Sequence, residues 1–240
     1  MKPTKKGKLG KYISLAIFLL LAILFIAKFG GPSILRLYVE TGIGTCQKIP
    51  ILCMAPKEEI LNPNINKDYI LELLTYKFPK MSISVPRGFA VSQERITKVY
   101  YKKRRKDNDT IIYLLYEEPN FFVNLFPQVN KHGLKDDYQF IRHTMYADLK
   151  NIKNLTDTFF VIMKSIFTPD VGDQNNLKMA QFSLPQRKGF INYNLSKTGN
   201  YFDCNVIDNQ GNFFKIYIRD KEAVLDLDKV MTIISTAARP

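Results

Sequence analysis

Residues 12–27 form an uncharged apolar run, and this run constrains the rest of the chain more than any other feature. A helix over residues 12–29, with the Lys28 amine reaching the lipid head groups, rises about 1.5 Å per residue and is long enough to cross a hydrocarbon core of about 30 Å. A cleaved secretory signal is the competing interpretation, but cleavage after Ala27 would place Phe25 where such a site needs a small residue. We therefore favour a retained transmembrane helix.

The charges around this run predict which side of the membrane the rest of the chain occupies. Five lysines precede the run: Lys2, Lys5, Lys6, Lys8 and Lys11. Because basic residues stay on the cytoplasmic side, residues 1–11 are expected to be a cytoplasmic tail. The protein is then a single-pass cell-membrane protein with the bulk of its chain outside the cytoplasm, in the periplasm or the extracellular space.

The net charge of the extracytoplasmic part limits its partners. The whole chain has 35 basic and 22 acidic residues, a net charge of +13, but six of the basic residues lie at or before Lys28. The 29 basic and 22 acidic residues that follow leave an excess of +7. This moderately basic surface is compatible with anionic lipid or a wall polymer, and we expect no nucleic-acid partner.

The chain beyond the predicted anchor, about 210 residues, is long enough for one domain with a sizeable core. Its first part is rich in residues that interrupt regular structure: Gly30, Gly31, Pro32, Gly42, Gly44, Pro50, Pro56 and Pro63. We interpret residues 30–66 as a stalk and residues 67–240 as an extracytoplasmic α+β domain.

The cysteines indicate one local disulfide. Cys46 and Cys53 lie in the predicted stalk and, in an oxidising compartment, are expected to bond to each other. A redox-active dithiol is the functional alternative, although such pairs usually have the closer Cys-x-x-Cys spacing. Cys204 shares a predicted strand face with Phe202 and Val206, which is typical of a buried thiol. A long-range bond from Cys204 to one of the other two is the alternative.

Two hydrophobic periodicities divide the domain into helices and strands. Helices are predicted at residues 68–78, 134–149 and 155–167 and near the C-terminus, where Asp226 or Asp228 can cap the last one. Strands are predicted at residues 81–85, 95–101, 110–116 and 120–126, followed by a four-strand meander over residues 180–218. Asn154 and Asp157 are placed to cap the helix 155–167. We therefore predict an α+β fold, with an antiparallel sheet flanked by helices and preceded by one transmembrane helix and a stalk.

A basic run separates the two predicted strands 95–101 and 110–116. It consists of Lys102, Lys103, Arg104, Arg105 and Lys106 and lies beside Tyr100 and Tyr101. A solvated hairpin tip that resists edge pairing is one interpretation. A binding site for an anionic surface, either lipid or wall polymer, is the other.

The only two histidines, His132 and His143, lie near Asp136 and Asp137. Such a pair without a nucleophile motif is weak support for acid–base catalysis, and we favour surface positions for both histidines. The chain has no P-loop, dinucleotide fingerprint, Gly-x-Ser-x-Gly elbow or zinc-ligand spacing. We therefore predict no catalytic residue, no cofactor and no metal ligand.

One short motif and the order of the predicted elements carry a family resemblance. The segment Ile83-Ser84-Val85-Pro86-Arg87-Gly88-Phe89 is followed by paired strands, a middle helix, a late hairpin and a terminal amphipathic helix. Over residues 81–238 this arrangement resembles the PsbP and DcrB-like extracytoplasmic domains. The resemblance implies an antiparallel sheet flanked by helices and an assembly or accessory role; it transfers no binding residue.

Two classes of function follow from these observations. The first is a non-enzymatic accessory or binding module, tethered to the membrane and presented to a partner protein or an envelope polymer. The second is an extracytoplasmic hydrolase or thiol-redox enzyme, which would use the histidines with the neighbouring aspartates or the pair Cys46 and Cys53.

Overall fold

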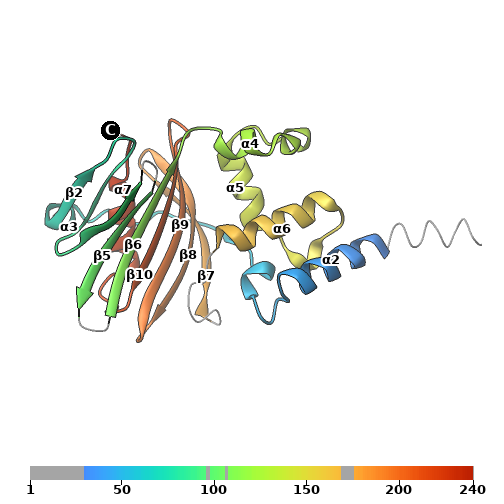
Figure 1. Ribbon diagram of the computed structural model, residues 1–240, viewed down its shortest axis with the longest axis horizontal. Helices are drawn as coiled ribbons and strands as arrows, with labels where there is room; N and C mark the ends of the chain where they lie inside the picture. The colour runs from blue at the N-terminus through green and yellow to red at the C-terminus, as the bar shows by residue number, and fades with distance from the viewer. Residues whose placement is uncertain (1–29, 96–97, 106–107, 169–175, 240) are drawn as a thin grey trace, which may run out of the picture.

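An eight-stranded sheet forms the body of the molecule, with helices at both of its faces (Figure 1). The computed structural model describes residues 30–95, 98–105, 108–168 and 176–239. Its strands are β1 (Lys57–Leu61), β2 (Leu73–Lys77), β3 (Ser82–Pro86), β4 (Ala90–Arg95), β5 (Lys98–Arg105), β6 (Asn108–Glu117), β7 (Lys178–Leu184), β8 (Arg187–Ser196), β9 (Gly199–Asp208) and β10 (Phe213–Asp220). Its helices are α2 (Gly31–Gly42), η2 (Pro50–Cys53), α3 (Lys67–Glu72), α4 (Phe121–Leu125), η3 (Pro127–His132), α5 (Asp137–Tyr146), η4 (Leu149–Asn151), α6 (Leu155–Phe167) and α7 (Leu227–Thr236).

The fold is α+β, as predicted, but the sheet is mixed rather than purely antiparallel. The strand order is β1-β7-β8-β9-β10-β6-β5-β4, and β2 and β3 form a separate pair. Strand β1 runs parallel to β7, and the other pairings in the sheet are antiparallel. The parallel pair arises because β1 follows η2 and β7 follows α6 along the chain, and η2 packs on α6. Both strands therefore leave the same helical layer in the same direction.

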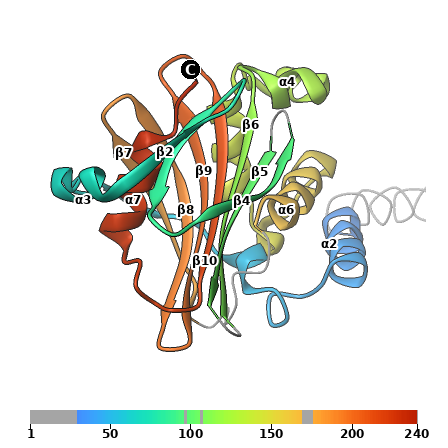
Figure 2. The same ribbon diagram turned by 60° about the vertical axis from the view of Figure 1, so that its left-hand side comes forward.

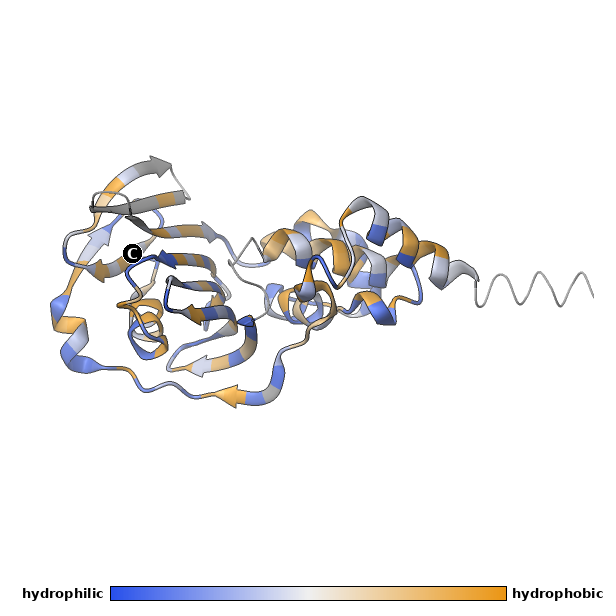
Figure 3. Cartoon of the chain, turned by 90° about the horizontal axis from the view of Figure 1, so that it is seen from below, coloured by the Kyte–Doolittle hydropathy of each residue, from blue (hydrophilic) through white to orange (hydrophobic). Residues whose placement is uncertain are grey.

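The two faces of the sheet carry two separate hydrophobic cores. One face packs against α7 and the β2–β3 pair, through residues such as Val230, Met231 and Ile83. The opposite face packs against a helical layer built from α2, η2, α4, α5 and α6. Figure 2 shows α7 and the helical layer on opposite sides of the strands. Figure 3 shows the alternation of apolar and polar residues along the strands. Such alternation places successive side chains on opposite faces.

The predicted meander is confirmed as β7 to β10. Phe202, Cys204 and Val206 are fully buried on one face of β9, as their alternation indicates. The turn between β9 and β10 is held by Asp208 Oδ1, which accepts from the backbone N–H of Gln210 and Asn212. Sequence patterns were sufficient here because each strand pairs with its neighbour in the chain.

The helix caps are confirmed as well. Asn154 accepts from the Asp157 N–H at 2.9 Å and begins α6, and Asp157 accepts from the Lys153 N–H at 2.8 Å. Asp226 accepts from the Lys229 N–H at 2.8 Å and begins α7. These side chains satisfy donors that a helix leaves open at its first turn.

The predicted helix over residues 68–78 is wrong in its second half. Helix α3 ends at Glu72, and β2 follows at once and pairs with β3. Apolar residues at 73, 74 and 78 fit a helical stripe and a short strand equally well. Pairing with β3 stabilises this segment as a strand. The hydroxyl groups of Thr75 and Ser84 also form a hydrogen bond of 2.8 Å between the two strands.

The predicted strand over residues 120–126 is also wrong, because this segment forms α4. The carboxylate of Asp137 accepts from the backbone N–H groups of Phe122 and Val123 at 2.9 and 3.2 Å. This cap comes from a residue that lies beyond α4 in the sequence. A local pattern of apolar residues does not reveal it.

The segment predicted as a stalk is part of the fold. Val39 of α2 and Ile51 and Leu52 of η2 are buried in the core of the helical layer, and β1 is an edge strand of the sheet. The glycines and prolines of residues 30–66 therefore separate short packed elements instead of marking a spacer.

The predicted transmembrane helix over residues 12–29 and the predicted tail over residues 1–11 lie outside the described residues. Within the described part of the chain, none of the helices combines the length and the apolar character that a bilayer crossing requires.

The close approach of β8 and β9 gives a test of the fold at Gly189. A Cβ at this position would lie 2.0 Å from the backbone oxygen of Asn205. Gly189→Ala is therefore expected to lower the free energy of unfolding by about 3 kcal/mol, as overpacking does. Gly42→Ala is the matched control, because its Cβ would meet nothing within 4 Å. Urea unfolding followed by circular dichroism measures both, and equal stabilities would contradict the packing of this pair.

Candidate functional site

The basic run predicted to bind anionic surfaces belongs to the β5–β6 hairpin. Lys102, Lys103, Arg104 and Arg105 lie in β5, which pairs with β6 up to Arg105 opposite Asn108. Lys106, at the turn, lies outside the described residues. The predicted hairpin is thus confirmed, but Lys102 to Arg105 lie within β5 and not at the hairpin tip where the sequence placed them. The binding of an anionic surface by this run stays a prediction.

The predicted disulfide is confirmed between Cys46 and Cys53. Both half-cystines pack at the edge of the helical core, beside Ile49 and Met54. Cys204 is a free thiol, fully buried on the α7 side of the sheet, and its burial raises its pKa well above the ordinary value. The disulfide therefore closes a loop within the helical layer.

Thiol titration follows directly from this arrangement. The native chain is expected to react with no equivalents of a thiol reagent, since its single free thiol, Cys204, is buried. Unfolding without reductant should expose one thiol, and unfolding with reductant should expose all three. A pair of thiols released by mild reductant while the fold persists would instead favour the redox interpretation.

The two histidines and the two aspartates proposed for acid–base work have separate structural surroundings. The Nε2 atom of His132 lies 3.0 Å from the hydroxyl oxygen of Thr156. Asp136 caps α5 by accepting from the Gln139 N–H, and Asp137 caps α4. Burial raises the pKa of Asp137, although its backbone hydrogen bonds oppose this shift.

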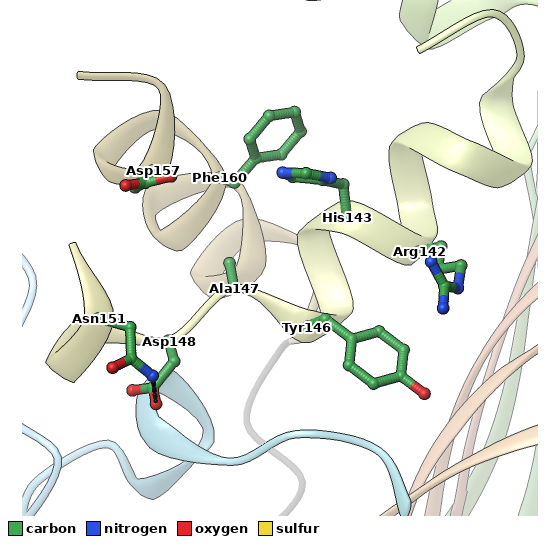
Figure 4. Close-up of a pocket in the computed structure, with 8 residues that line it drawn as sticks. All are labelled: Arg142, His143, Tyr146, Ala147, Asp148, Asn151, Asp157 and Phe160. Atoms are coloured by element: carbon green, nitrogen blue, oxygen red, sulfur yellow. Dashed lines mark hydrogen bonds between the residues drawn. The ribbon is translucent and has the colours of Figure 1, made fainter. Parts of the chain in front are cut away.

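His143 lines a polar hollow of about 380 Å³ between α5, η4 and α6. Figure 4 shows its imidazole beside the Phe160 ring, and the two ring centroids lie 4.6 Å apart. Burial against this ring lowers the pKa of His143, and the nearby Asp157 partly opposes the shift. The exposed imidazole is therefore packed on an aromatic ring at the edge of the hollow.

The other polar groups of this hollow are engaged locally. The Arg142 guanidinium lies over the Tyr146 ring, 5.2 Å from its centroid. Asp148 accepts from the Asn151 amide at 2.7 Å, the dashed line in Figure 4. Asp157 lies on the other side of the hollow from the pair of Arg142 and Tyr146 (Figure 4). These groups diverge, so the hollow presents a polar surface rather than a nucleophile with its base.

A second pocket, of about 320 Å³, is mainly apolar and lies between the sheet and the ends of α4 and α6. Its lining consists of Leu115, Phe121, Phe122, Ile166, Phe167 and Phe213, with Tyr113, Glu117 and Lys215 as polar members. Phe122 lies at the centre of an aromatic cluster, with edge contacts to Phe167 and Phe213 at centroid distances of 5.0 and 4.9 Å. Two of the lining residues are open to solvent, because Ile166 is 65% and Phe121 36% exposed. We refer to this site as the apolar pocket.

Lys215, one of the residues that line the apolar pocket, belongs to a buried ion pair. Lys215 Nζ lies 2.6 Å from Asp203 Oδ1, with side-chain exposures of 11% and 0%. The same ammonium donates to Asn205 Oδ1 at 3.1 Å and to the Phe167 backbone oxygen at the end of α6. Burial raises the pKa of Asp203, and the Lys215 ammonium partly opposes this shift. The pair fixes α6 on the sheet and so fixes the shape of the pocket.

The buried polar residues around Lys215 follow a pattern that is visible in the sequence. Asn192, Asp203, Asn205 and Lys215 alternate with apolar residues on three neighbouring strands, and all four lie on one face of the sheet. Such alternation normally indicates a solvent-facing side. Here the helical layer covers that side.

Lys164 is a second buried lysine that local patterns did not single out. It lies on α6, is fully buried, and donates to the backbone oxygens of Ala147, at 2.7 Å, and Met54. Burial lowers the pKa of Lys164 to about 7. The amine therefore joins the chain just after the disulfide loop to the end of α5.

The lowered pKa of Lys164 predicts a pH dependence of stability. Above pH 7 the unfolded chain keeps a proton on this lysine that the folded chain has lost, so the free energy of unfolding rises with pH. The expected rise between pH 7 and 9.5 is on the order of 3 kcal/mol. Lys164→Met should abolish this rise, and Lys153→Met, at an exposed lysine, should keep it. Urea unfolding across this pH range measures the slopes, and an unchanged slope in Lys164→Met would contradict the assignment.

Among the described residues, no group of three or more His, Cys, Asp and Glu side chains is placed to hold a metal ion. In comparisons with known proteins, no protein-family model and no curated protein matches the chain. The function is therefore inferred from the residues and contacts described above.

Proposed function

We propose that the protein is a membrane-tethered, extracytoplasmic binding module without enzymatic activity, and that its apolar pocket receives an apolar side chain of a partner protein. The anchor in this proposal is the predicted transmembrane helix over residues 12–29. The disulfide between Cys46 and Cys53 supports an oxidising compartment outside the cytoplasm. The resemblance to PsbP and DcrB-like domains supports the same class of accessory role.

The apolar pocket is the observation that carries this proposal. Its volume of about 320 Å³ lies at the lower end of the range for ligand sites, which suits one or two large side chains. Exposed aromatic and aliphatic side chains around such a pocket are typical of the anchor points of protein interfaces. Exposed Ile166 and Phe121 at its rim fit this role.

The chemistry of the pocket favours a protein partner over an envelope polymer. A glycan needs convergent hydrogen-bond groups, and the lining is dominated by phenylalanine and aliphatic side chains. The ammonium of Lys215 is already engaged by Asp203, Asn205 and the end of α6. An anionic polymer therefore finds no uncommitted lysine there, and the basic run of β5 is the better candidate for one.

Site-specific crosslinking in intact membranes tests the pocket. A photoreactive phenylalanine analogue in place of Phe121 is expected to give one discrete crosslinked protein. Ile166→Lys, which places a charge at the rim, should reduce that crosslink at least tenfold because it opposes entry of an apolar side chain.

Leu71→Lys is the matched control. Leu71 is an apolar residue that is more exposed than Ile166, and it lies on α3, outside the apolar pocket. This control should leave the crosslink unchanged. Crosslinks to lipid or polymer alone, or equal losses in both variants, would overturn the proposal.

A further inference from the structure

Helix α2 is apolar on two faces, and only one of them is used within the domain. Its inner face packs Leu35 and Val39 into the core of the helical layer. Its outer face exposes Ile34, Leu37 and Tyr38, which are 65%, 59% and 66% exposed. A surface helix normally keeps its outer face polar, so this face is suited to a second, apolar environment.

The position of α2 in the chain identifies that environment. Gly30, the residue before α2, already has helical backbone angles (φ −77°, ψ −38°). The predicted transmembrane helix over residues 12–29 ends directly before Gly30. An exposed apolar helix face next to a membrane anchor is suited to lie along the membrane interface, as amphipathic helices do. Tyr38 fits this placement, because tyrosine is preferred in the interfacial layer.

Cationic groups lie beside the same helix. The Arg36 guanidinium donates to the Lys150 backbone oxygen at 2.5 Å, which holds η4 against α2. Lys150 and Lys153, on and just after η4, are exposed. Exposed basic residues close to a membrane surface attract anionic head groups.

We propose that the outer face of α2 is embedded in the interface of the membrane that holds the anchor, so that the helical layer lies against the bilayer. This inference rests on the anchor in the proposed function. It sets the orientation of the whole domain, because α2 and the strands β5 and β6 lie toward opposite ends of the long axis (Figure 1). Strand β5, which carries the basic run, then lies away from this bilayer, and the anionic partner of this run is something other than the lipid of that membrane.

Spin-label accessibility in the full chain tests the orientation. Tyr38→Cys and Leu71→Cys, each labelled with a nitroxide, are compared in nanodiscs of phosphatidylethanolamine and phosphatidylglycerol that hold one chain each. The label at 38 is expected to be several-fold more accessible to oxygen than to a water-soluble nickel complex. The label at 71, on α3 near the other end of the molecule (Figure 1), should show the reverse.

A third label, at Leu20→Cys, separates the two proposals. One outcome is that the label at position 20 is protected from the nickel complex, whereas the label at position 38 is as accessible to that complex as the label at position 71. The anchor then stands, and the docking of α2 is overturned. If 20 itself is accessible to nickel, the anchor and the proposed function fail. Spin–spin broadening at 38 in discs that hold two chains, with nickel accessibility at 38 in single-chain discs, would show that α2 pairs with a second copy and would also overturn the docking.

Discussion

The ammonium of Lys215 is the contact on which the placement of the helical layer depends. It lies on the central strand β10, pairs with Asp203 on β9, and donates to the last carbonyl of α6. A cation suits the C-terminal end of a helix, where the backbone oxygens are unpaired. Removal of one partner from such a buried pair leaves an uncompensated charge, which costs about 3–5 kcal/mol. The sheet thus holds α6 by charge as well as by apolar contact.

Helix α6 in turn organises the N-terminal elements. Lys164 on its inner side binds backbone oxygens from the segments after η2 and after α5, and the disulfide closes the loop that leads into η2. Val39 of α2 and Leu52 of η2 complete the same core. The chain that comes from the predicted anchor is therefore built into the fold before the first strand begins.

Local patterns predicted those parts of the fold that depend on neighbours in the sequence. The meander β7 to β10, the cap at Asn154 and the disulfide follow from periodicity, capping chemistry and spacing. Long-range contacts decided the rest. Asp137 caps α4 in a segment where a strand was expected, and the parallel pairing of β1 with β7 makes the sheet mixed. The site residues Lys164 and Lys215 were missed for the same reason, because a lysine in an apolar pattern predicts a solvated position until the covering element is known.

The apolar pocket and the outer face of α2 together restrict how a partner can approach. The pocket lies where α4 and α6 meet the sheet, and α2 packs on α6 within the same layer. If α2 lies on the bilayer, a partner that reaches the pocket comes from beside the domain, close to the membrane surface. A partner with its own membrane segment meets this requirement with less loss of translational freedom than a soluble one, since both are already confined to the same plane. On these two proposals, a neighbouring membrane protein suits the pocket better than a soluble partner.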